Sequence, residues 1–130
     1  IHQEPIYPYI LVEHGADISA NYDRTIINSS EYGNFEIVKY LIDNGADITA
    51  INEYGFTPLD LSSKNGHYEI VKLLVECRAS IIKTDNLTLI LASENGHIKI
   101  VKLLVENGAD IRYHNNYSLQ LALKEAIVKS

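Results

Sequence analysis

The sequence lacks the features that disulfide-stabilised, membrane-spanning and secreted proteins have. It contains one cysteine, Cys77, and neither methionine nor tryptophan. A single cysteine excludes an intramolecular disulfide framework and is typical of a reducing compartment. No apolar run approaches the roughly 18 residues that cross a bilayer, and the N-terminus lacks the basic start and apolar stretch of a signal peptide. We therefore expect an intracellular location in a reducing compartment such as the cytoplasm, without secretion and without a membrane partner.

Basic residues are too few and too scattered for a phosphate-binding surface. The chain has 11 Lys and Arg against 17 Asp and Glu, which gives a net charge of -6. The basic residues form no cluster along the sequence. Proteins that bind nucleic acids usually present such a cluster to the phosphate backbone. The charge pattern therefore excludes nucleic acid as the expected partner.

The residue types used in catalysis are present, but they lack the spacing that catalysis needs. Of the five histidines, His2, His14 and His114 have no Cys, His or carboxylate companions at the spacing of a zinc or calcium site. Cys77 has no base at a fixed spacing, so a buried or half-buried thiol near a helix end is favoured over a nucleophile. Phosphate-binding and dinucleotide-binding glycine motifs are missing. We expect no catalytic residue, no cofactor and no metal, and hence no enzyme.

What the sequence does contain is an internal repeat. Gly-Ala-Asp-Ile occurs at residues 15–18, 45–48 and 108–111, and a damaged copy at 78–81 has Arg78 in the glycine position. Successive copies are 30, 33 and 30 residues apart. A fixed period in this range indicates one supersecondary unit copied along the chain, with each copy burying its apolar side against its neighbours. Such an array is expected to act through a surface.

The segment before each turn indicates the kind of repeat. Residues 33–42 read Gly-Asn-Phe-Glu-Ile-Val-Lys-Tyr-Leu-Ile, 66–75 read Gly-His-Tyr-Glu-Ile-Val-Lys-Leu-Leu-Val, and 96–105 read Gly-His-Ile-Lys-Ile-Val-Lys-Leu-Leu-Val. Together with Gly-Phe-Thr-Pro-Leu at 55–59, this pattern resembles the ankyrin repeat over nearly the whole chain. The resemblance implies an all-α solenoid of stacked helix-turn-helix units with short β-hairpin or loop fingers.

The repeat positions divide the chain into units. Residues 1–130 are predicted to form a single ankyrin-repeat domain, with repeats at 20–49, 50–82 and 83–112 and partial repeats at 1–19 and 113–130. The 30-residue units are similar to the shortened ankyrin repeats of giant DNA viruses of amoebae. Because a natural reading frame starts with methionine, we also expect the 130 residues to be a piece of a longer protein or to have lost their start.

Local signals predict where the first helices begin. Thr57 before Pro58 predicts a helix N-cap, with Asp60 completing a capping box and Gly66 ending the helix. In the shorter units, counting back ten residues from Gly33, Gly96 and Ala126 predicts N-caps at Asp23, Asn86 and Asn116. These units are expected to have fingers that project less than the finger at 51–56.

The resemblance also implies residue roles. In this family the histidines that follow the helix-ending glycines, here His67 and His97, form hydrogen bonds in the loops. Partners are usually contacted by the finger tips and the exposed side of the first helices, which line a concave face. The positions that carry over are Tyr22, Asp23, Arg24, Tyr32, Glu53, Tyr54, Phe56, Lys64, Asp85, Glu94, Arg112, Tyr113 and His114. Tyrosines are favoured because they give large contact area at low entropy cost, although they could instead cover neighbouring repeats.

Two functions remain open. The first is a non-catalytic protein–protein interaction module, a monomer that binds a partner protein through the concave face. The likeness to viral repeats suggests a host protein as that partner. The second is a structural spacer or a substrate-recruiting arm of a larger enzyme or ubiquitin-ligase adaptor. The full reading frame would discriminate between them.

Overall fold

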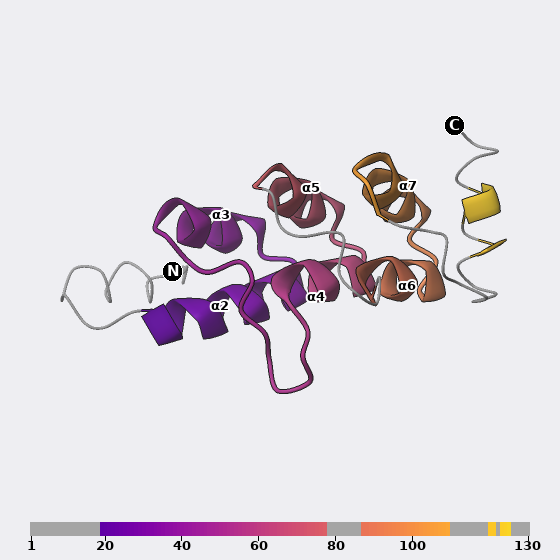
Figure 1. Ribbon diagram of the computed structural model, residues 1–130. Helices are drawn as coiled ribbons and strands as arrows, with labels where there is room; N and C mark the ends of the chain where they lie inside the picture. The colour runs from indigo at the N-terminus through magenta and orange to yellow at the C-terminus, as the bar shows by residue number, and fades with distance from the viewer. Residues whose placement is uncertain (1–18, 78–86, 110–119, 122, 126–130) are drawn as a thin grey trace, which may run out of the picture.

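The computed structural model describes residues 19–77, 87–109, 120–121 and 123–125 of the chain. The helices in these ranges form successive pairs: α2 (Ser19–Tyr32) with α3 (Phe35–Asp43), α4 (Pro58–Lys64) with α5 (Tyr68–Glu76), and α6 (Leu87–Glu94) with α7 (Ile98–Glu106). Figure 1 shows α2, α4 and α6 in one layer and α3, α5 and α7 in a second layer. No strand occurs among the described residues. The predicted all-α array of helix pairs is confirmed.

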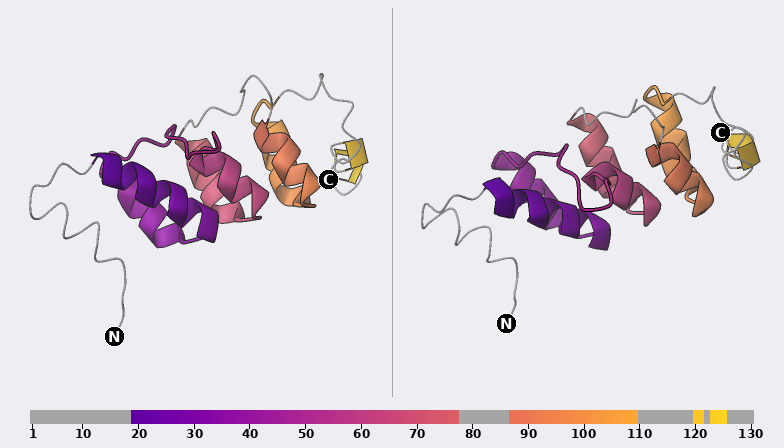
Figure 2. Two further views of the ribbon diagram at one scale, coloured as in Figure 1. Left: turned by 90° about the horizontal axis from the view of Figure 1, so that it is seen from below. Right: turned by 60° about the horizontal axis from the view of Figure 1, so that its bottom comes forward.

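Helices of one layer contact their neighbours in chain order. The first helices contact one another, α2 with α4 and α4 with α6, more extensively than α3 contacts α5 and α5 contacts α7. Each first helix also contacts its own second helix. Figure 2 shows the same succession of pairs from two further directions. Each pair therefore buries its apolar side against the next pair, as expected of a solenoid.

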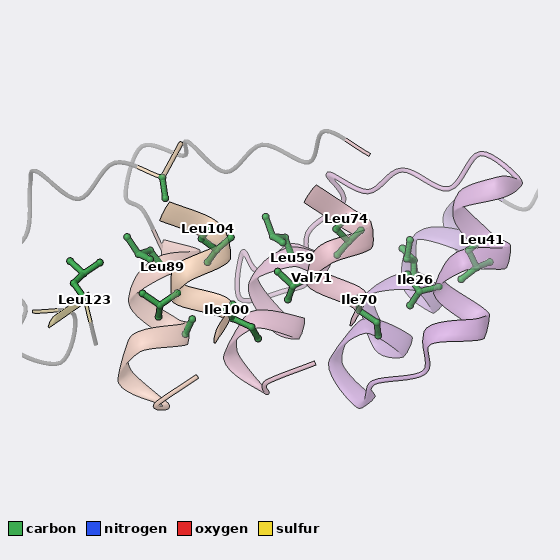
Figure 3. Close-up of a cluster of buried hydrophobic side chains, with 14 of the residues drawn as sticks. Ile26, Leu41, Leu59, Ile70, Val71, Leu74, Leu89, Ile100, Leu104 and Leu123 are labelled. Carbon is green, nitrogen blue, oxygen red and sulfur yellow. The ribbon is translucent and has the colours of Figure 1, made fainter. Parts of the chain in front are cut away.

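The core is built from the same positions in each repeat (Figure 3). The second helices carry apolar residues at i, i+3 and i+4, which places them on one face. The buried members are Val38 and Leu41 in α3, Ile70, Val71 and Leu74 in α5, and Ile100, Val101 and Leu104 in α7. Ile26, Leu59 and Leu89 of the first helices join the same cluster, as does Leu123. The periodic pattern in the sequence thus becomes one continuous core.

The start of α4 confirms the predicted capping box. The Asp60 amide donates to Thr57 Oγ1 at 3.1 Å, and the Thr57 amide donates to Asp60 Oδ2 at 3.0 Å. The second carboxylate oxygen, Oδ1, accepts a hydrogen bond from the Thr88 hydroxyl of the following repeat. Asp60 is 2% exposed. One buried carboxylate therefore caps α4 and links two repeats.

Helix α2 begins earlier than the sequence predicted. Asp23 was expected as its N-cap, but α2 starts at Ser19, so Asp23 lies inside the helix. The segment 19–22 contains neither glycine nor proline to stop the helix, and Tyr22 gains burial by continuing it. The 20–49 repeat has helix where the 50–82 repeat has its finger, so the prediction of a smaller finger is confirmed there. Asn86, Asn116 and the start of the 83–112 repeat lie outside the described residues.

Two histidines join successive repeats. His67 Nε2 lies 2.9 Å from the carbonyl oxygen of Glu31, and His97 Nε2 lies 3.0 Å from that of Lys64. The Glu31 oxygen also accepts a hydrogen bond from Asn65 Nδ2 at 3.0 Å. These bonds satisfy carbonyl groups at the ends of α2 and α4, which have no partner inside the helix. The predicted loop-bonding role of the two histidines is confirmed.

Candidate partner-binding surface

The 51–56 finger is a tight loop organised by one side chain. Asn52 Oδ1 accepts hydrogen bonds from the amides of Tyr54 at 2.9 Å and Phe56 at 3.0 Å. The Asn52 amide donates to the Phe56 carbonyl, and the Gly55 amide donates to the Asn52 carbonyl, both at 3.0 Å. Gly55 supplies the positive φ of 83° that the turn needs. The finger is therefore held in one shape and projects beyond the layer of first helices (Figure 1).

The repeated aspartate fixes the chain just before the finger. Asp47 Oδ1 accepts hydrogen bonds from the Thr49 hydroxyl at 2.6 Å and the Thr49 amide at 2.8 Å. These two bonds, the one from the hydroxyl first, lower the pKa of the Asp47 carboxyl, because they favour its charged form. The turn therefore carries a local reason for its aspartate that does not involve a partner.

A concavity lies between the finger and α2. Its volume is about 570 Å³, and it is lined by Asp23, Arg24, Ile27 and Asn28 from α2 and by Ile51, Asn52 and Glu53 from the finger. Among the predicted site residues, the structure brings Asp23, Arg24 and Glu53 together here. Sequence reasoning missed the other four. Ile27 and Asn28 could have been found from their spacing of four residues from Asp23 and Arg24 on one helix.

Tyr54 occupies the tip of the finger. Its side chain is 74% exposed, although large apolar surfaces are usually covered in a folded protein. Phe56, at the base of the same finger, is half-buried. The structure thus separates two predicted residues into an exposed tip and a supporting base.

A second group of predicted residues lies at the other end of the first helices. Tyr32 ends α2 and is 77% exposed, and Lys64 and Glu94 end α4 and α6. Tyr32 follows Asp23 by nine positions on α2, which corresponds to a rise of about 14 Å. The predicted site therefore divides into the concavity with its finger and the C-terminal ends of the first helices.

Tyr22 is a correction to the predicted site. It was expected on the binding surface, but it is 2% exposed and belongs to the hydrophobic core. The early start of α2 makes Tyr22 a helical residue that points into the core. Burial raises the pKa of the Tyr22 phenol above its ordinary value, and the neighbouring Tyr40 raises it further. Tyr22 is thus unavailable to a partner in this fold.

The raised pKa of Tyr22 predicts a loss of stability at alkaline pH. The unfolded chain releases its Tyr22 proton at lower pH than the folded chain does. The stability contributed by the neutral phenol is therefore complete below the unfolded pKa and is lost as pH rises through the folded pKa. We expect Tyr22→Phe to make the alkaline decline of the free energy of unfolding shallower in urea titrations. Tyr54→Phe, at an exposed position, is the matched control, and equal declines in Tyr22→Phe and wild type would contradict the prediction.

The predicted surface also includes residues of segments that the structure does not describe. Asp85, Arg112, Tyr113 and His114 lie outside the described residues, as does Arg78.

Cys77 is the half-buried C-cap residue of α5. Within the described ranges, no group of three or more His, Cys, Asp and Glu side chains could hold a metal ion. No helix in those ranges is both long enough and apolar enough to span a bilayer.

The comparison with known families agrees with the geometry. A family model described as ankyrin repeats (3 copies) matches residues 4–85 and, in an overlapping match, residues 31–115. The two matches together extend from residue 4 to residue 115, which is most of the 130-residue chain. Helix pairs, histidine-bonded loops and a projecting finger occur in the same order as the sequence pattern. The chain belongs to the ankyrin-repeat family.

Proposed function

We propose that this protein binds another protein through the finger and the concavity beside it, without performing chemistry. Ankyrin repeats are generally protein–protein interaction modules, and the family is typically non-catalytic. The proposal needs no cofactor, metal or nucleic acid. By likeness to the shortened viral repeats, the partner would be a host protein.

The observation that carries the proposal is the fixed and exposed position of Tyr54. Asn52 and Gly55 hold the finger in one shape through short-range hydrogen bonds. Because this loop is already ordered, binding a partner would not lose free energy to the ordering of the loop. Tyrosine adds large amphipathic area with few rotatable bonds, which is why it is common at binding hot spots.

The concavity supports the proposal through its mixture of groups. Ile51 is 59% exposed and offers apolar area, while Asp23, Arg24 and Glu53 offer charge of both signs. Charged groups at the rim of an interface set the association rate and its dependence on salt more than the final affinity. The two carboxylates outnumber the one guanidinium, so a partner that presents cationic and aliphatic side chains would fit best.

Tyr54→Ala is expected to abolish or strongly weaken capture of the partner without unfolding the domain. A hot-spot tyrosine contributes about 2 kcal/mol, which corresponds to roughly a 30-fold rise in Kd. Wild-type and Tyr54→Ala baits would be compared in affinity purification from cell lysate with detection by mass spectrometry. Each protein that is lost with the variant would then be purified and titrated against both baits.

Tyr32→Ala is the matched control, because it removes an equally exposed tyrosine from the far end of α2. If Tyr32→Ala weakens the interaction and Tyr54→Ala leaves it unchanged, the interface lies at the helix ends and the proposed site is wrong. If neither variant matters and no protein binds directly, the alternative role as a structural spacer or recruiting arm is supported instead.

Glu53→Lys tests the charge argument, since it should slow association most at low salt.

A further inference from the structure

Four of the seven glycines follow an asparagine, at Asn44-Gly45, Asn65-Gly66, Asn95-Gly96 and Asn107-Gly108. Each of these asparagines comes directly after the last residue of a helix, and all four are exposed to water. Glycine has no Cβ to hinder its backbone nitrogen. An Asn-Gly pair is therefore chemically suited to spontaneous deamidation, and neither the fold nor the proposed function requires that reactivity.

The reaction consumes one water and releases one ammonia. The deprotonated glycine nitrogen attacks the asparagine Cγ, the new N–Cγ bond closes a succinimide ring, and the Cγ–Nδ2 bond breaks as ammonia leaves. Water then opens the ring at one of its two carbonyl groups, which gives aspartate or isoaspartate. No oxidant, reductant or cofactor takes part, and the chain gains one negative charge.

The backbone of the folded chain holds the turns at Asn44, Asn65 and Asn107 away from the reactive geometry. Ring closure requires rotation about the Cα–C bond until the glycine nitrogen eclipses Cβ. The asparagine ψ angles are 20° at Asn44, 3° at Asn65 and 19° at Asn107. At such values the glycine nitrogen nearly eclipses the asparagine's own backbone nitrogen instead of Cβ. The side chain cannot close the ring without a change in the turn.

Hydrogen bonds hold both reacting groups in place. The Asn44, Asn95 and Asn107 side-chain amides each donate at 2.8 Å to the carbonyl oxygen four residues earlier. The amides of the glycines that follow donate to helix carbonyls, each at 3.1 Å. Asn65 differs, because its side-chain amide donates at 3.0 Å to Glu31 of the preceding repeat. In three turns the asparagine side chain thus bonds to its own helix, and in the fourth it bonds to the preceding repeat.

We propose that these Asn-Gly turns are deamidation sites that react only when the adjoining helix end unwinds, and that reaction at Asn65 loosens the joint between two repeats. Unwinding frees ψ, and in the turns at Asn44, Asn95 and Asn107 it breaks the hydrogen bonds of both amides at once. Helix ends open locally at far lower cost than the whole domain. A carboxylate at position 65 cannot donate to the Glu31 carbonyl, and it adds negative charge at the negative end of the α4 dipole.

The first test compares reaction rates at each turn in the folded and unfolded 130-residue chain. The protein is incubated at mildly alkaline pH with and without guanidinium, and proteolytic peptides are analysed by mass spectrometry for conversion at each asparagine. A short Asn-Gly peptide in both solutions corrects for effects of the denaturant. We expect each turn to react at least about tenfold more slowly in the folded chain, the factor for an open state populated at one part in ten. Equal corrected rates would overturn the gating.

The second test separates the role of Asn65 from a general effect of added charge. Asn65→Asp and Asn44→Asp introduce the same carboxylate at the C-cap of a helix, but of these two side chains only that of Asn65 reaches another repeat. We expect Asn65→Asp to lower Tm more and to speed hydrogen exchange of the Gly33 and Asn34 amides, which follow α2 and donate to the Ser29 carbonyl of its last turn. Asn65→Ala removes the donor without adding charge and should reproduce the faster exchange even if Asn65→Asp fails to fold. Unchanged exchange in Asn65→Ala, or equal effects of the two Asp variants, would overturn the role at the joint.

Discussion

Replacing Gly66 with alanine is expected to lower the free energy of unfolding by about 3 kcal/mol, through two separable effects. Gly66 has a φ of 81°, where an L side chain costs about 1 kcal/mol. A Cβ at this position would also lie 2.6 Å from His97 Cε1 and 2.8 Å from Nδ1. The ring cannot retreat freely, because Nε2 is bonded to the Lys64 carbonyl. Forcing atoms into such a contact costs a further 1–3 kcal/mol or so, and urea unfolding followed by circular dichroism would measure the total.

Gly45→Ala is the matched control for this prediction. Gly45 also follows an asparagine at a helix end and has a φ of 89°, but nothing lies within 4 Å of the added Cβ. In Gly45→Ala the free energy of unfolding should fall only by the backbone contribution of about 1 kcal/mol. The double variant Gly66→Ala with His97→Ala should be less destabilised than the sum of its single variants, since the clash disappears. Equal losses at positions 45 and 66 would show that the histidine ring does not require the glycine.

Asp60→Ala, in the first turn of α4, is also expected to lower the free energy of unfolding by about 3 kcal/mol. The carboxylate accepts from the Thr57 amide and the Thr88 hydroxyl, and all three residues are buried. Hydrogen bonds to a charged group contribute about 1.5–3 kcal/mol, and removal of this one acceptor leaves two buried donors without a partner. Loss of the capping box adds to the cost. The expected result is a clear fall in Tm, measured by thermal unfolding at neutral pH.

Asp43→Ala controls for the loss of a negative charge. Asp43 pairs with Lys39 at 3.3 Å on the exposed surface, and such a pair contributes at most about 0.5 kcal/mol. Thr88→Val keeps the shape and removes the hydroxyl, so a double-mutant cycle with Asp60→Ala isolates the bond between repeats. A coupling energy of about 1 kcal/mol or more is expected. No coupling, or equal effects at positions 43 and 60, would refute the link through Asp60.

The sequence predicted local features well where hydrogen bonds are made within a few residues. Thr57, Pro58 and Asp60 specify a helix start through their own chemistry, and Gly66 specifies its end. The apolar positions of the second helices repeat with the period of a helix, so their burial followed from spacing alone. The roles of His67 and His97 followed from the family pattern. Even so, the sequence showed only the capping role of Asp60. Its hydrogen bond to Thr88 was not predicted, because Thr88 is 28 positions away.

The candidate site was predicted less well, because exposure depends on packing. Tyr22 and Tyr54 were equally favoured from the sequence, yet the structure buries the first in the core and exposes the second at a finger tip. Asp23 was predicted to begin a helix that in fact begins at Ser19. Ile51 and Asn52 carried no signal of their own, because the concavity that they line exists only where the finger meets α2.

The sequence by itself thus determined the kind of fold, its period, the boundaries of α4 and the family to which the chain belongs. These properties follow from residue types at fixed separations along the chain. Only the tertiary structure decided which tyrosine can face a partner, that Gly66 lies against the His97 ring and which asparagine joins two repeats. Those properties depend on which atoms of one repeat lie against the next, and that contact forms only when the repeats stack.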